Sequence, residues 1–363
     1  PGVGSKAGSG SLGPGLNPGG PVGVAGSGSL APVAGRGPIG PADPSVCAEA
    51  QVRADRINPT VYLVLDGSGS MNANFGGGGT RWQVLRQTLL GPEGVVTKLS
   101  GVVKFGMTIY ANNDPMKCPA LSEVKPALDN LKVIEPAFPR TEPGGGTPTG
   151  EALQRVIDGL PAFTGGPGSG EAHPPIVILA TDGEPNGCAN AATCNWLDWA
   201  NCLGMLLGQL ANAPATYDST LMAVRKAKEK GIPVWVISLA NGLATIPNLQ
   251  RTANIGAGLD ENASPGATIY SPQNPNELTA TLSKLIGDVV SCDVALHGTL
   301  TVDRACEGTV KMNGEVLKCG DANGWKALDT KRIELQGQAC ARFKSDPSVL
   351  LDARFPCDVV VPL

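Results

Sequence analysis

The fold of this chain is decided by Val61-Tyr-Leu-Val-Leu65, which runs directly into Asp66-Gly-Ser68-Gly-Ser70-Met71. A strand without polar alternation is buried on both faces, as in parallel sheets that helices cover on both sides. The loop behind it carries one carboxylate and two hydroxyls, the oxygen ligands that a hard divalent cation such as Mg²⁺ prefers. We therefore expect a metal site where this strand ends, although Gly, Ser and Asp also cluster in ordinary turns.

Two later segments repeat parts of this pattern. Gly144-Gly-Gly-Thr147 is a glycine loop that opens a helix, with Pro148 near the first helical position, and it offers a further hydroxyl. Ile176-Val-Ile-Leu-Ala-Thr181 is a second apolar strand that ends in a carboxylate, Asp182. Ligands of such sheets bind outside the carboxyl ends of the strands, so Asp66 and Asp182 are expected at one edge of the sheet.

On these motifs the chain resembles von Willebrand factor A domains, over roughly residues 58 to 290. In that family Asp-x-Ser-x-Ser, a Thr in the next loop and an Asp after the fourth strand form the metal-ion-dependent adhesion site. The matching positions here are Asp66, Ser68, Ser70, Thr147 and Asp182. The resemblance implies that the first three are constant ligands, while Thr147 and Asp182 exchange between direct and water-mediated contact.

The same resemblance implies a function. Two carboxylates and three neutral hydroxyls leave a divalent cation short of its usual six oxygens, so water completes the shell and a partner's carboxylate can replace it. We expect an extracellular adhesion or protein-binding module that favours Mg²⁺, with Ca²⁺ or Mn²⁺ as alternatives. Its partner would be a protein that offers an Asp or Glu side chain.

The hydrophobic pattern around these motifs alternates between helices and strands. Helices are expected at 81–90, 150–160, 220–230 and 274–290, and strands at 102–111 and 232–239. Such alternation predicts an α/β domain of the doubly wound, Rossmann-like kind with a mostly parallel sheet. We place this domain at residues 46–290, with a cysteine-containing insertion at about 184–217 that forms either a rim around the metal site or a helical cap.

Residues 1–45 differ from the rest, because about half of them are Gly or Pro and they lack hydrophobic periodicity. Composition predicts an extended, flexible arm. Within it Ala7-Gly-Ser-Gly-Ser-Leu12 recurs as Ala25-Gly-Ser-Gly-Ser-Leu30. An arm with two similar docking segments could bind a neighbouring subunit head to tail, which leads to a fibre. The alternative function is therefore a structural subunit of an extracellular filament, self-associating through residues 1–45; a passive tether is the simpler interpretation of the arm.

Residues 291–363 change to short alternating stretches, at 294–302, 309–317, 332–335 and 348–355, with Asn313-Gly314 as a hairpin signal. They predict a small cysteine-rich β module. With Gly324-Trp325, Gly337-Gln-Ala-Cys340 and Phe355-Pro-Cys357, it resembles the tail of secreted von Willebrand factor A proteins of myxobacteria and other deltaproteobacteria.

Ten cysteines without a CxxC metal pair indicate an oxidising compartment and permit five disulfides. They are Cys47, Cys118, Cys188, Cys194, Cys202, Cys292, Cys306, Cys319, Cys340 and Cys357. Sequence does not fix the pairing. One pairing that we consider joins Cys47, before the first strand, to the cysteine just after the last helix, Cys292.

Composition also excludes several functions. A formal charge of −4 over 363 residues gives no basic field for nucleic acid. The two histidines, His173 and His297, lie beside no nucleophile motif, and no Gly-x4-Gly-Lys-Ser/Thr loop occurs, so we expect no enzyme. No apolar run is long enough to span a bilayer. Because the chain begins without Met or a signal segment, we expect a processed form or a fragment that is secreted or displayed on the cell surface.

Overall fold

The computed structural model describes residues 49–112, 117–165, 173–188, 218–240 and 247–362. The predicted arm at 1–45 lies outside these ranges, and so does the predicted insertion at 184–217 beyond residue 188. The docking of the arm and the role of the insertion therefore stay predictions.

The α/β domain is built on a five-stranded sheet with the strand order β5-β4-β3-β6-β7. Its strands are β3 (Thr60–Asp66), β4 (Lys104–Ala111), β5 (Ala120–Ala127), β6 (Ile176–Thr181) and β7 (Val234–Ser238). All neighbours run parallel except β5, which pairs antiparallel with β4 at one edge. Because β3 lies between β4 and β6, the chain reverses its direction of winding there, and the predicted doubly wound fold is confirmed.

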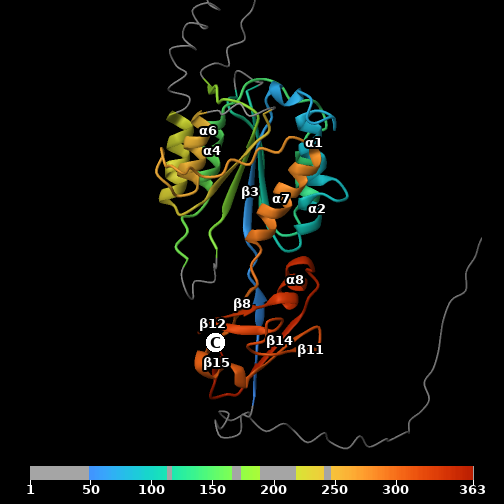
Figure 1. Cartoon of the computed structure of the whole chain (residues 1–363), viewed down its shortest axis with the longest axis vertical. Helices are drawn as coiled ribbons and strands as arrows, with labels where there is room; N and C mark the ends of the chain where they lie inside the picture. Colours follow the sequence, from blue (N-terminus) through green and yellow to red (C-terminus); the bar gives the residue numbers. More distant parts are fainter. Residues whose placement is uncertain (1–48, 113–116, 166–172, 189–217, 241–246, 363) are drawn as a thin grey trace, which may run out of the picture. The chain divides into compact units, whose positions relative to one another are not determined.

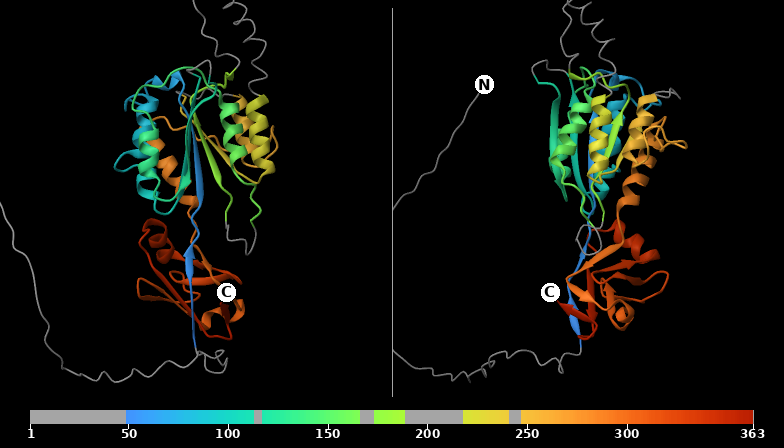
Figure 2. Two further views of the ribbon diagram at one scale, coloured as in Figure 1. Left: turned by 180° about the vertical axis from the view of Figure 1, so that it is seen from behind. Right: turned by 90° about the vertical axis from the view of Figure 1, so that its left-hand side faces the viewer.

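Helices cover both faces of this sheet (Figures 1 and 2). One layer contains α1 (Arg81–Leu90), α2 (Val95–Leu99) and α7 (Pro275–Val289). The other contains α4 (Thr149–Gly159), α6 (Pro247–Gly256) and the helical residues 218–229. Successive residues of β3 pack into opposite layers, since Leu63 joins the core with Trp82 of α1 while Val64 joins the core with Val156 of α4.

The predicted elements of this domain are present, with ends that differ by up to two residues from the expected ones. Sequence patterns missed the antiparallel strand β5 and the helices α2, α3 (Leu131–Ala137) and α6. A short 3-10 turn, η1 (Gly69–Asn72), occupies the loop after β3.

The first strands of the described chain belong to the C-terminal module. Strand β1 (Ala50–Val52) pairs with β14 (Leu351–Phe355), and β2 (Ala54–Arg56) pairs with β8 (Asp293–Leu296). The expected boundary assigned residues 46–56 to the α/β domain, whereas residues 50–56 complete the sheets of the module. Strands of three residues gain their stability from such long-range pairing, which a local pattern does not reveal.

The module contains two four-stranded sheets, with the orders β1-β14-β10-β11 and β12-β13-β8-β2, and a short β15-β9 pair. The remaining elements are β9 (Gly298–Leu300), η4 (Val302–Glu307), β10 (Thr309–Met312), β11 (Glu315–Leu317), β12 (Trp325–Asp329), β13 (Arg332–Leu335), α8 (Gly337–Ser345) and β15 (Val360–Pro362). The predicted hairpin at Asn313-Gly314 joins β10 to β11, and both residues have a positive φ. Helix α8 was not expected.

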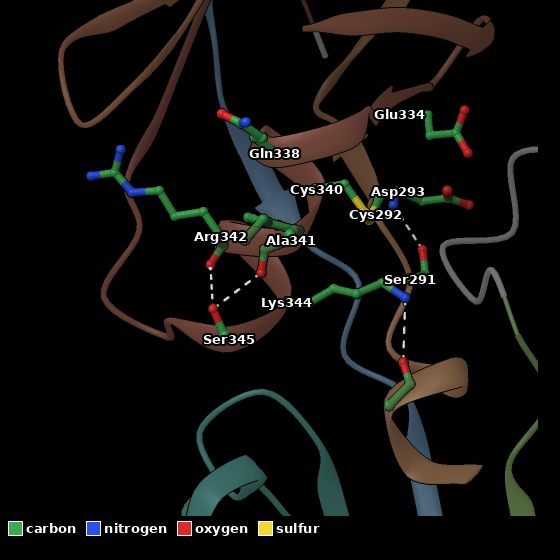
Figure 3. The surroundings of a disulfide bond; sticks show 12 residues. Ser291, Cys292, Asp293, Glu334, Gln338, Cys340, Ala341, Arg342, Lys344 and Ser345 are labelled. Atoms are coloured by element: carbon green, nitrogen blue, oxygen red, sulfur yellow. Dashed lines mark hydrogen bonds between the residues drawn. A yellow bond between two sulfur atoms is a disulfide. The ribbon is translucent and has the colours of Figure 1, made fainter. Parts of the chain in front are cut away.

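Three disulfides join described residues: Cys118–Cys188, Cys292–Cys340 and Cys306–Cys319. Cys340 lies in α8 and Cys292 directly before β8, so this bond ties the helix of the module to its sheet (Figure 3). The expected pairing of Cys292 with Cys47 is therefore wrong. Cys357 is also disulfide-bonded, while Cys47, Cys194 and Cys202 lie outside the described residues.

Candidate functional site

The first part of the site is the turn that follows β3. The Asp66 side chain is fully buried, and its Oδ1 accepts a hydrogen bond of 2.8 Å from the backbone N–H of Ser68. Between them, the N–H of Gly67 donates to the Tyr110 carbonyl of the neighbouring strand. A Cβ at Gly67 would lie 3.0 Å from the Ile109 side chain. The close approach to β4 thus favours a glycine, because any side chain would have to displace its neighbours.

The second part comes from the end of β6. The hydroxyl of Thr181 donates to Asp66 Oδ2 over 2.7 Å, and Ser70 Oγ donates to Asp182 Oδ1 over 2.7 Å. The hydroxyls of Ser68 and Ser70 are 2.9 Å apart. A continuous set of hydrogen bonds therefore connects the loops after two adjacent parallel strands, as their shared edge predicts.

The third part is the loop before α4, which carries Thr147. It is joined to the first loop through the backbone, because Gly69 N–H donates to the Gly145 carbonyl over 3.0 Å. The Thr147 residue is buried, and its N–H donates to the side-chain oxygen of Asn186. Asn186 in turn donates its own N–H to the Thr147 carbonyl. The structure therefore brings all five predicted residues onto three adjoining loops.

Burial dominates the electrostatics of this site. Burial, with a smaller contribution from the negative charge of Asp182, raises the pKa of Asp66 to about 6, against hydrogen bonds from Thr181 and Ser68 that lower it. Burial likewise raises the pKa of the Tyr110 hydroxyl, with the charge of Asp66 adding to the effect. Burying a carboxylate among neutral donors costs free energy unless a positive charge compensates.

This donor set fits a hard divalent cation. The hydrogen bonds that Asp66 accepts come from a backbone N–H and two neutral hydroxyl-bearing residues, so its charge lacks a basic partner among them. Carboxylate and hydroxyl oxygens are the ligands such cations take. Within the described ranges no group of three or more His, Cys, Asp or Glu side chains could hold a metal. Any site here therefore depends on the hydroxyls as well as on the two carboxylates.

Sequence reasoning missed one charged residue of the site, Arg81. Its guanidinium donates to Asp182 Oδ2 and, over 3.1 Å, to the Ser70 carbonyl. Its side chain is 11% exposed and that of Asp182 is fully buried. The signal was its place at the first position of α1, directly after the capping Thr80, because the helix that follows β3 begins at the edge where β3 ends.

The loop after Asp182 is pinned against the Thr147 loop. The Cys118–Cys188 disulfide joins it to the segment before β5. The N–H of Cys188 also donates to Glu151 Oε1 in the first turn of α4, over 3.0 Å. Whether the insertion forms a rim or a helical cap stays a prediction, because the rest of it lies outside the described residues.

A pocket of about 220 Å³ opens beside the site, at the end of β4 and the start of β5. Its lining includes Gly67, Trp82, Leu121, Pro139, Glu142 and Gly144. The walls are mixed, with apolar side chains such as Trp82 and Leu121 beside the exposed carboxylate of Glu142.

The two histidines take no part in this site. His173 is exposed, as expected, and His297 Nε2 lies 2.8 Å from Asp55 in the C-terminal module.

Neither a protein-family model nor a curated protein matches the chain. Among solved structures it is similar to the PilB minor pilin from Streptococcus sanguinis, with 19% identity, a TM-score of 0.43 and 64% of this chain covered. The match covers 61% of the pilin, less than two thirds of its length.

Two further structures are similar. The manganese-loaded TRAP protein of Plasmodium vivax has 17% identity and a TM-score of 0.39, over 66% of this chain and 78% of that one. A von Willebrand factor type A protein from Catenulispora acidiphila has 12% identity and a TM-score of 0.38, over 85% and 64%. Because these identities and TM-scores are low, the description of the fold and of the site rests on the residues of this chain alone.

Proposed function

We propose that this chain is an extracellular adhesion or protein-binding module that captures a partner's carboxylate through a divalent cation. The cation would be held directly by Asp66, Ser68 and Ser70, with Thr147 and Asp182 in direct or water-mediated contact. Mg²⁺ is the expected cation, with Mn²⁺ and Ca²⁺ as alternatives. The proposed role is binding rather than catalysis.

One observation carries the proposal: a fully buried carboxylate, Asp66, faces neutral donors at the carboxyl edge of a parallel sheet. A buried charge of this kind is costly in a protein that has no use for it. The hydroxyls of Ser68 and Ser70 lie on the same turn, and Ser70 connects them to Asp182.

In this proposal the cation, Asp66 and the serine hydroxyls have different roles. When bound, the cation supplies the positive charge that attracts a carboxylate. Asp66 provides the compensating negative charge from its buried position, and the serine hydroxyls add neutral oxygens. Because Ser70 is exposed, this side of the site stays open to a partner. The neighbouring pocket would offer both apolar and polar contacts to the partner residue beside the captured acid.

The proposed location outside the cytoplasm rests on the disulfides of the chain. Disulfides persist in oxidising compartments, and the described residues contain three complete ones. In the described part of the chain, no helix is both long and apolar enough for a membrane span. Secretion or surface display is the proposed location.

Metal binding is tested by calorimetric titration of the full chain with Mg²⁺ and Mn²⁺. We expect saturable binding to the wild type and none to Asp66→Ala. Asp260→Ala, which removes an exposed aspartate after α6, serves as the matched control and should bind like the wild type. Equal heats from the wild type and Asp66→Ala would rule out the proposed site.

Carboxylate capture is tested on a peptide array in which every Asp or Glu peptide has an Asn or Gln counterpart. Binding of the Mg²⁺-loaded chain should require the acid and disappear in EDTA. Binding that survives EDTA, or that tolerates the amide counterparts, would show that the partner is held in another way.

Self-association through residues 1–45 remains the alternative. It is tested separately, by negative-stain microscopy of protein with and without that segment. Assemblies that are unchanged by the deletion would exclude the arm.

A further inference from the structure

Arg81 is held in place by the start of α1. Thr80 caps this helix, its hydroxyl accepting from Gln83 N–H while the Gln83 side chain accepts from Thr80 N–H. The backbone N–H of Arg81 donates to the Ala73 carbonyl, at the end of η1. These bonds fix the first helical residue directly against the turn that carries Ser68 and Ser70.

The side chain of Arg81 engages the second carboxylate of the site. Its guanidinium forms an ion pair with Asp182 Oδ2. The other oxygen, Oδ1, accepts a hydrogen bond from the hydroxyl of Ser70. Both oxygens of Asp182 therefore have partners, and both partners hold it from the side of the η1 turn. Asp66 has no such arginine among the donors to its carboxylate.

The charges of the site change accordingly. Two carboxylates and one guanidinium carry one net negative charge, since arginine is always charged in proteins. A divalent cation added to this set leaves one net positive charge. Without Arg81 the same cation would leave the site neutral, with less attraction for an incoming anion.

We propose that Arg81 is a positioning residue, which keeps Asp182 out of direct contact with the cation and leaves the loaded site positively charged. The inference rests on the proposed function. Arg81 lowers the affinity for the cation, because it repels a second positive charge and occupies a carboxylate that would otherwise bind it. In return it preserves an open coordination position and strengthens the capture of the partner's carboxylate.

The test uses the full chain and Mn²⁺, which reports on both affinity and hydration. We expect Arg81→Met, which removes the charge and retains much of the bulk, to bind Mn²⁺ about tenfold more tightly than the wild type. Water-proton relaxation should show one fewer exchangeable water on the bound Mn²⁺, as Asp182 takes its place. Acetate, as a carboxylate probe, should bind the loaded variant several-fold more weakly.

Two further variants make the test specific. Arg81→Gln removes the charge but keeps a donor for Asp182, and it should shift the Mn²⁺ affinity in the same direction by a smaller factor. Arg86→Met removes another arginine of the same helix, which contacts Glu135 and Phe138 instead, and it should behave like the wild type.

The outcomes separate the two proposals. If neither the wild type nor Asp66→Ala binds Mn²⁺, the proposed function itself fails. If the wild type binds Mn²⁺ but Arg81→Met shows the same affinity and the same hydration, only the role of Arg81 is overturned. Loss of the folded circular-dichroism spectrum in both Arg81 variants would assign this residue to stability and overturn its role in the same way.

Discussion

The α/β domain and the C-terminal module differ in the polar side chains that they bury. In the part of the chain that the structure describes, the buried polar and charged side chains lie between Asp66 and Asn254, and none belongs to the module. Both parts bury large apolar residues, such as Phe105 in the α/β domain and Trp325 and Phe355 in the module. Its charges pair at the surface, as Arg304 does with Glu307 and Asp358.

This difference separates a site from a scaffold. Buried polar groups cost free energy unless they are satisfied, so a cluster of them at one edge of a sheet points to a function. An apolar core with surface ion pairs contributes stability and carries no chemistry of its own. We therefore assign metal binding to the α/β domain and a supporting role to the module.

The largest effect should come from the core of the module. Trp325 is fully buried, packs edge to face against Phe355 at 6.0 Å and donates from its indole to the Leu317 carbonyl. Trp325→Ala should lower the free energy of unfolding by about 3 to 5 kcal/mol, measured by urea denaturation followed by circular dichroism.

The Mn²⁺ affinity of this variant, measured while it is still folded, should equal that of the wild type. A folded Trp325→Ala protein that no longer binds Mn²⁺ would contradict the division between site and scaffold.

The disulfides allow a second comparison between the site and the module. Cys118–Cys188 closes a separation of 70 residues beside the site, and Cys306–Cys319 closes one of 13 within the module. In the chain-entropy description, replacing both cysteines by serine costs about 4 kcal/mol in the first case and about 3 kcal/mol in the second.

Metal titration distinguishes the two pairs. The double variant Cys118→Ser with Cys188→Ser should also bind Mn²⁺ more weakly, because it frees the loop that holds Thr147. Cys306→Ser with Cys319→Ser should leave the Mn²⁺ affinity unchanged. Equal effects of both pairs on Mn²⁺ binding would show that the rim does not support the site.

The smallest effect is expected at the hairpin of the module. Gly314 has a φ of 86°, and a Cβ there would meet no atom within 4 Å, so only the backbone conformation disfavours a side chain. Gly314→Ala should cost about 1 kcal/mol in thermal or urea unfolding. An unchanged stability would mean that the turn relaxes, and any change in Mn²⁺ affinity would again link the module to the site.

Sequence patterns predicted the parts of the structure that depend on neighbouring residues. Uninterrupted apolar runs before Asp66 and Asp182 were enough to place both carboxylates at one edge of a parallel sheet, and Asn313-Gly314 was enough to place a hairpin. Asp66, Ser68, Ser70 and Asp182 lie together for this reason, and Thr147 joins them through the loop before α4.

The parts that were missed depend on long-range contacts. Residues 50–56 pair with strands about 240 to 300 residues further along the chain. A strand of three residues is too short for its hydrophobic pattern to show which strand it pairs with. Cys292 pairs with Cys340 because α8 packs against β13, the strand beside β8, and this nine-residue helix begins with a glycine, which disfavours a helix locally. The contact of Arg81 with Asp182 depends on how the capped helix meets the η1 turn, which the sequence does not encode locally.

The most direct test of the metal site is a crystal structure of the full chain grown with Mn²⁺, with anomalous scattering used to locate the ion. We predict an anomalous peak in contact with the side-chain oxygens of Asp66, Ser68 and Ser70, at the carboxyl end of β3. A saturated crystal without a peak there, or with its peak away from Asp66, would contradict the account.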